Sequence, residues 1–142
     1  MRSVRDFFVF DLMCDGREIA TPITISPTNS EQQLHNCTAI WDTGATSSMI
    51  SQRIAQQLQL SPQGSVKVSG VHGVENANIY TVDLMFNNGH EMPNIQVSEA
   101  GNNAGFDILV GMDVISRGIF IIDGVNHAVR GCQIAFALPL DK

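Results

Sequence analysis

A carboxylate at the end of an apolar stretch is the first residue of this sequence with clear chemical potential. In "AIWDTGATSSMIS", residues 39–51, an apolar run that predicts a buried strand leads directly into Asp42. A carboxylate is costly to bury as a charge unless it is paired or has a function. The next residues, Thr43, Gly44 and Ala45, predict a tight turn that presents Asp42 to a molecule that must come close.

The chemistry that such a carboxylate could perform is amide hydrolysis without a metal. That reaction needs a base to take a proton from water and an acid to protonate the departing group, and two adjacent carboxylates that share one proton supply both. The chain has one Asp-Thr-Gly, and the other acids in apolar surroundings, Asp107, Asp113 and Asp123, are not followed by this turn. The sequence therefore predicts that the second carboxylate comes from another copy of the chain.

Composition limits the classes of protein that this chain can belong to. Its 142 residues favour a single domain, and 44% hydrophobic with 15% charged residues is typical of a folded chain. The formal net charge is −6, and no basic cluster is present that could follow a phosphate backbone. We therefore expect no nucleic-acid partner.

Cysteine and histidine usage indicates neither disulfides nor a metal. The three cysteines, Cys14, Cys37 and Cys132, have no CxxC spacing, and the four histidines have no ligand-like spacing. The thiols are expected to be buried in a reducing compartment. No apolar segment is long enough to cross a bilayer, and the N-terminus lacks a clear cleavage site, so we expect a cytoplasmic protein with no membrane partner.

The elements that must position Asp42 are short strands separated by turns. Period-2 alternation is clearest at Tyr80, Val82, Leu84 and Phe86, and Pro22 favours an edge position for its strand. Two short helices are expected at residues 52–60, with Ser51 as the cap, and at 112–117, where Gly118 is expected to end the helix. The predicted strands cover residues 7–14, 18–26, 39–41, the two arms of a hairpin within 66–86, 94–99, 106–111, 119–123 and 132–138.

Three landmarks in this order resemble those of the retropepsin-like, retroviral-type aspartic proteases. They are "DTGA" at residues 42–45, the hairpin tip bracketed by Gly70 and Gly73, and "ILVGMD" at residues 108–113. The resemblance covers residues 37–138 and implies an all-β fold, a closed, barrel-like acid-protease half-domain with a flap hairpin and one or two short helices. We expect residues 1–142 to form one such domain, with the N-terminal strands of residues 1–36 matching less clearly.

The resemblance also implies roles for the residues of the first landmark. Asp42 would be the catalytic carboxylate of an aspartic endopeptidase, and Thr43 would donate a hydrogen bond across a two-fold axis to fix the two loops of a homodimer. The carbonyl of Gly44 would hold the backbone of a peptide or protein substrate. No cofactor is implied, because the two carboxylates activate the water.

Further residues are expected to contact the substrate or to support the site. Ala45, Thr46 and Val110 would line the substrate site, and Gly111 would let the "ILVG" strand pass close behind the loop of Asp42. The flap that closes over the peptide would consist of the four consecutive residues Gly70, Val71, His72 and Gly73. Asp113 is expected to start a helix or to brace a loop.

The chain departs from the viral pattern at two positions together. Many viral members have an acid after DTGA and an arginine after the glycine of the later landmark, whereas Thr46 and Met112 stand here. No charge is left unpaired, and the hydroxyls of Thr46 and Ser47 are expected to replace the missing contacts. Two-lobed pepsin-type enzymes usually have a hydroxyl where Ala45 stands, and its absence favours activity at milder acidity.

Alternatives stay open at each of these points. Asp42 can be an ordinary turn residue whose side chain bonds its own backbone, and the hairpin of residues 66–86 can be a plain hairpin. The alternative function is a dimeric peptide-binding module with weak or lost proteolysis. For the dimer, we expect the apolar strand of residues 132–140 to leave an exposed edge that pairs with a second copy.

Overall fold

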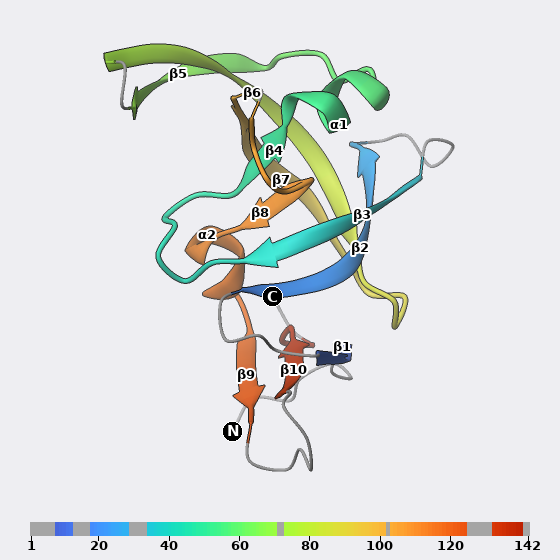
Figure 1. Ribbon diagram of the computed structural model, residues 1–142. Coiled ribbons are helices and arrows are strands. Elements are labelled where there is room, and N and C mark those ends of the chain that lie inside the picture. Colours follow the sequence, from blue (N-terminus) through green and yellow to red (C-terminus); the bar gives the residue numbers. More distant parts are fainter. Residues whose placement is uncertain are drawn as a thin grey trace.

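A computed structural model describes most of the chain, and Figure 1 shows its arrangement. The described residues are 8–12, 18–28, 34–70, 73–101, 103–124 and 132–140. Strands predominate, with two short helices among them, so the all-β prediction is confirmed. None of the helices in these ranges is long and apolar enough to cross a bilayer.

The larger sheet has seven strands, and all of them except β5 form a closed ring. The order is β2-β3-β8-β4-β7-β6-β5, and an additional β2–β6 pairing closes the ring. The strands are β2 (Ile19–Pro27), β3 (His35–Trp41), β4 (Met49–Ser51), β5 (Gly64–Gly70), β6 (Gly73–Met85), β7 (Glu91–Ala100) and β8 (Ile108–Val110). Closure leaves fewer unpaired strand edges on the ring.

Strand β2, which contains Pro22, pairs with two different strands along its length. Its first part pairs with β3 from Ile19 to Ile25, and its last part pairs with β6 from Thr24 to Pro27. Pro22 lies opposite Thr38, before the β6 pairing begins, where β2 has a partner on one side only. The edge position that the proline predicted is confirmed for that part of the strand.

The core fills the inside of the ring. Alternation along β6 buries Tyr80, Val82 and Leu84, as the sequence predicts, and β3 buries Cys37, Ala39 and Trp41 in the same way. Fully buried branched side chains from β2, β4, β7, β8 and α1 complete the centre: Ile25, Ile50, Ile54, Ile95, Val97, Ile108 and Val110.

Both helices are shorter than the sequence pattern predicts. Helix α1 (Gln52–Gln57) starts at the Ser51 cap, whose side chain accepts from Ile54 N, and ends before Gln59, which has a φ of 53°. Helix α2 (Met112–Ile115) ends well before Gly118. Gly118 has no positive φ; a Cβ there would lie 2.3 Å from the Ala137 carbonyl oxygen, so this position needs glycine for packing and not for ending the helix.

A second, three-stranded sheet joins β1 (Phe8–Leu12), β10 (Cys132–Ala137) and β9 (Ile119–Asp123) in the order β1-β10-β9. Figure 1 shows it beneath the ring. Trp41 of β3 stacks on Phe120, and Phe136 of β10 packs against both of these aromatic side chains. These contacts attach the three-stranded sheet to the core.

The place of β10 corrects the prediction of an exposed terminal edge. Antiparallel partners flank β10 on both sides, from Phe8↔Phe136 in β1 to Phe120↔Phe136 in β9. The edge strands of this sheet are β1 and β9 instead. The error has a physical cause: an apolar strand near the end of a sequence shows nothing of which earlier strand returns to cover it.

Candidate active site

Asp42 lies where β3 leaves the ring. The backbone N–H of Asp42 donates to the Val110 carbonyl at 2.9 Å, which continues the parallel β3–β8 ladder one residue beyond Trp41↔Val110. The strand direction is therefore kept up to Asp42. Because side chains alternate, that of Asp42 lies on the face of half-buried Ile40, opposite the buried Trp41.

A tight turn follows the carboxylate. Asp42 Oδ1 accepts from the Gly44 backbone N–H at 2.8 Å, and the Asp42 carbonyl accepts from Ala45 N at 3.2 Å. An ordinary turn-forming aspartate makes the same side-chain contact, so this bond fits both interpretations of Asp42. What goes beyond an ordinary turn is the support that the loop receives from behind.

The turn between β8 and α2 supports the loop by close backbone packing. Met112 N donates to the Ala45 carbonyl at 2.8 Å. A Cβ built on Gly111 would lie 2.9 Å from the carbonyl oxygens of both Ala45 and Ser47, so any side chain there would displace the loop. The close approach predicted for Gly111 is therefore present.

A buried hydroxyl and a carboxylate form the second support. Ser48 is fully buried; its Oγ donates to Asp113 Oδ1 at 2.7 Å and accepts from Gly111 N at 3.0 Å, while Ser48 N donates to Asp113 Oδ2 at 3.0 Å. Asp113 also accepts from Val114 N in the first turn of α2. Asp113 thus braces the loop, one of the two roles expected from the sequence, while the N-cap position of α2 belongs to Gly111.

The other predicted site residues differ in their exposure to solvent. Thr43, Gly44 and Thr46 are exposed, and Ala45 is half-buried. Val110 is wholly buried, at 0% exposure, so its side chain packs in the core and does not face a substrate. Val110 instead supports the loop through its carbonyl, which accepts from Asp42 N.

The predicted flap is a two-stranded ribbon formed by β5 and the first part of β6. Pairing runs from Gly64↔Ile79 to Gly70↔Gly73, and Gly73 has a φ of 110°. Val71 and His72, predicted to form the tip, lie outside the described residues. Side chains on both faces of the ribbon are largely exposed, Val74 at 63%, and Figure 1 shows the hairpin reaching beyond the ring.

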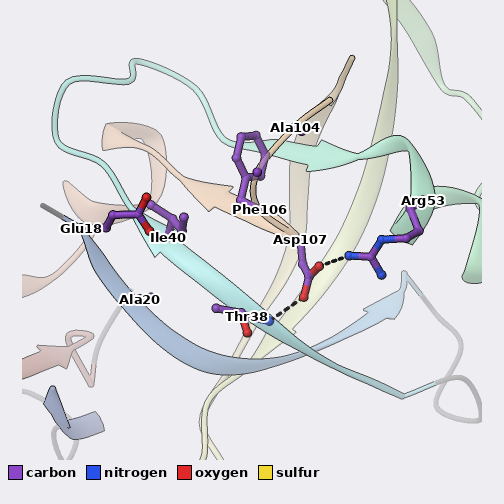
Figure 2. A pocket seen from close by; sticks show the side chains of 9 residues that line it. Glu18, Ala20, Thr38, Ile40, Arg53, Ala104, Phe106 and Asp107 are labelled. Atoms are coloured by element: carbon purple, nitrogen blue, oxygen red, sulfur yellow. Dashed lines mark hydrogen bonds and ion pairs between the residues drawn. The ribbon is translucent and has the colours of Figure 1, made fainter. Parts of the chain in front are cut away.

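A cavity of about 340 Å³ opens on the outer face of β3, on the same side as Asp42. Figure 2 shows its lining, with Thr38 and Ile40 on β3 and the Arg53–Asp107 ion pair at one end. Asp107 Oδ2 also accepts from Thr38 N at 2.9 Å. No local pattern in the sequence predicts this cavity, because it depends on the approach of β2 and the 104–107 loop to β3, and contacts between distant segments have no local signal.

Two titratable groups of the core have shifted pKa values. Burial raises the pKa of the Cys37 thiol to about 12; the negative charge of Asp107 adds to this shift, and Arg53 opposes it. Burial and the hydrogen bond to Glu99 raise the pKa of Tyr80. A thiol that stays protonated is a poor nucleophile, so Cys37 is a structural residue. Within the described ranges, no three His, Cys, Asp or Glu side chains gather as metal ligands would.

Ser48 is the supporting residue that sequence reasoning missed. A serine among several small polar residues carries no sign of burial, and strand β4, which Ser48 directly precedes, was not among the predicted strands. The interpretation of Asp113 as a bracing acid was the available clue, because a half-buried carboxylate needs hydrogen-bond donors and the loop is their nearest source.

Comparison with known proteins agrees with this geometry. The model of the family described as "gag-polyprotein putative aspartyl protease" matches residues 30–117. Among solved structures, a retropepsin-like aspartic protease from Rickettsia conorii is similar with a TM-score of 0.61 and 16% identity, over 96% of each chain. EIAV protease in complex with the inhibitor HBY-793 is similar with a TM-score of 0.52 and 16% identity, over 72% of this chain and 88% of that one. No curated protein sequence matches.

Proposed function

Because this chain belongs to the gag-polyprotein aspartyl protease family, we propose that it is an aspartic endopeptidase whose active site forms between two copies of the chain. The observation that carries the proposal is the loop of Asp42. It leaves the ring at the end of β3, is held from behind by Ser48, Gly111 and Asp113, and keeps Thr43 and Gly44 exposed. A rigid loop with exposed functional groups suits catalysis, because catalytic groups must be held in place.

The partner copy supplies what one chain lacks. The described residues contain one Asp-Thr-Gly turn, and the other acid near the loop, Asp113, is fully engaged with Ser48 and Val114. A two-fold axis beside Thr43 would bring a second Asp42 next to the first, and two-fold dimers are the commonest assemblies of identical chains. Thr43 is exposed, as a residue that donates across this axis must be in the separate chain.

The proposed reaction uses the two Asp42 carboxylates and one shared proton. One carboxylate takes a proton from a water molecule, whose oxygen attacks the peptide carbonyl carbon, while the protonated partner donates to the carbonyl oxygen. The tetrahedral intermediate collapses when the C–N bond breaks: the carboxylic acid formed in the first step protonates the amine, and the ionised carboxylate takes a hydroxyl proton of the intermediate, which restores the shared proton. The exposed β5–β6 ribbon would close over the bound peptide and exclude water.

The test compares the wild-type chain with Asp42→Asn on a synthetic peptide library, with cleaved bonds read by mass spectrometry. Asparagine keeps the size of the side chain and its acceptor for Gly44 N, so the fold is expected to persist. We expect cleavage by the wild type and at least a hundredfold less by the variant, the order of magnitude that general acid–base catalysis contributes. The thermal transition of both proteins serves as the folding control.

Two outcomes would overturn the proposal. Equal cleavage by Asp42→Asn would place the chemistry elsewhere in the chain. Saturable peptide binding without cleavage across a broad pH range would indicate the peptide-binding module instead.

A further inference from the structure

The cavity beside Asp42 holds a carboxylate that has no partner among the described residues. Glu18 lies at its rim, exposed, and the carboxylate makes no hydrogen bond or ion pair with the part of the chain that the structure describes. The other two charges of the lining, Arg53 and Asp107, are bonded to each other. The lining therefore has a net charge of −1, and the unneutralised charge belongs to Glu18.

The strand register places Glu18 next to the proposed catalytic residue. The last β2–β3 pair is Ile19↔Trp41, and the residues directly beside this pair are Glu18, just before β2, and Asp42, just after β3. The preceding alternate pair, Ala20↔Ile40, lies on the same face, and both of its residues line the cavity. A side chain next to the scissile bond would enter the cavity from this end.

The rest of the lining is suited to an aliphatic stem. Figure 2 shows Glu18 beside Ile40 at one end of the cavity and the Arg53–Asp107 pair at the other, with Ala104 and Phe106 along one wall. Both Asp107 oxygens are occupied, one by Arg53 and the other by Thr38 N. An acidic side chain would meet Glu18 and would have to separate Arg53 from Asp107.

We propose that this cavity is a specificity pocket for a lysine or arginine side chain of the substrate, with its stem on Ile40 and Phe106 and its cation at Glu18. The inference rests on the proposed function and adds the class of residue beside the cleaved bond. A long cationic side chain buries its methylenes and keeps its head in water, which matches a half-apolar cavity with a charged rim.

The experiment uses a positional-scanning peptide library in which the residues on each side of the cleaved bond are fixed as Lys, Arg, norleucine, Gln or Glu. Wild type, Glu18→Gln and Glu91→Gln are compared by initial cleavage rates, the last being the same charge change at an exposed site on β7, outside the cavity lining. We expect Glu18→Gln to lose about 2- to 5-fold on Lys and Arg peptides, the size of one exposed ion pair, with norleucine peptides unchanged. Glu91→Gln should behave as wild type, and Glu18→Lys should favour Glu peptides.

The outcomes separate this inference from the function on which it rests. No cleavage by wild type, or cleavage that Asp42→Asn retains, contradicts the proposed protease. Cleavage that depends on Asp42 but is equal for Lys and norleucine peptides overturns the pocket alone, as does a Lys preference that Glu18→Gln retains.

Discussion

At the scale of single residues, the loop of Asp42 depends on one buried hydroxyl more than on the aspartate's own turn. Ser48 Oγ both donates to Asp113 and accepts from Gly111 N, so it connects the loop to α2. We predict that Ser48→Ala lowers the free energy of unfolding by about 1–3 kcal/mol, because the buried Gly111 N–H and the half-buried Asp113 carboxylate each lose a hydrogen-bond partner. Urea denaturation measures the change.

The neighbouring Ser47→Ala is the matched control. Ser47 is exposed, and its substitution removes the same hydroxyl group as Ser48→Ala does. Ser47→Ala should therefore change the free energy of unfolding by less than about 0.5 kcal/mol. Similar effects of the two variants would mean that the Ser48 hydroxyl does not brace the loop.

The Cys37 thiol makes the free energy of unfolding depend on pH in the alkaline range. Its ordinary pKa is 9.0 and burial raises it to about 12, so between these values the folded chain keeps a proton that the unfolded chain loses. The free energy of unfolding should therefore fall above pH 9, by up to about 1.4 kcal/mol per pH unit from this one group. In Cys37→Ala the decline between pH 9 and 10 should be shallower, and an unchanged slope would contradict the assignment.

Single residues also show where sequence reasoning reached its limit. The close approach of Gly111, which the resemblance to the retropepsin-like proteases implied, is confirmed, because a Cβ there would lie 2.9 Å from the Ala45 carbonyl oxygen. Val110 was expected to line the substrate site, but Ile108 and Val110 share one face of β8, and both side chains are fully buried in the core. Glu18 had no local signal, because its place near Asp42 depends on the β2–β3 register, whose last pair is Ile19↔Trp41.

At the scale of elements, the flap ribbon is separate from the core that stabilises the fold. Gly73 has a φ of 110°, and a Cβ there would meet no atom within 4 Å, so a substitution strains only the local backbone. We predict that Gly73→Ala reduces kcat/KM by about tenfold or more through misplaced closure, equivalent to ~1.4 kcal/mol of strain. The Tm should fall by several degrees at most, the shift that ~1.4 kcal/mol gives a domain of about this size.

The comparison for this variant is Gly64→Ala, at the other end of the same ribbon. Gly64 has free space for a Cβ and no positive φ, so its substitution should leave both kcat/KM and Tm unchanged. If Gly73→Ala is as active as Gly64→Ala, the tip geometry has no part in catalysis.

The strands were easier to predict than their partners. Alternation at Tyr80, Val82 and Leu84 located β6 correctly, and glycines at 70 and 73 located the hairpin tip, since both are local features. The β2–β6 closure and the central place of β10 were not predicted. Both are contacts between segments far apart in the chain. They depend on the packing of the core and of the aromatic side chains that surround Trp41.

At the scale of the whole molecule, a site shared between copies makes activity depend on concentration. Activity per chain should fall on dilution, and mixing with Asp42→Asn should lower activity by more than dilution does. If chains pair at random, equal amounts of the two leave about one quarter of dimers fully wild type, against one half expected for independent chains. Steady-state rates across a mixing series, with light scattering for mass, distinguish these values.

A monomer with undiminished activity at the lowest measurable concentration would contradict the shared site. A linear mixing curve would do the same, provided that Asp42→Asn has the same mass as wild type by light scattering at the concentrations used.

The pairing of β1 with β10 also limits the order in which parts of the chain can fold during translation. The strands of the ring, β2 to β8, are all synthesised before β9 and β10, so the ring can close while translation continues. Strand β1 is complete once residue 12 has been synthesised, but its partner β10 begins only at residue 132. During that interval its backbone is an open edge, the kind of surface to which chaperones and neighbouring nascent chains bind.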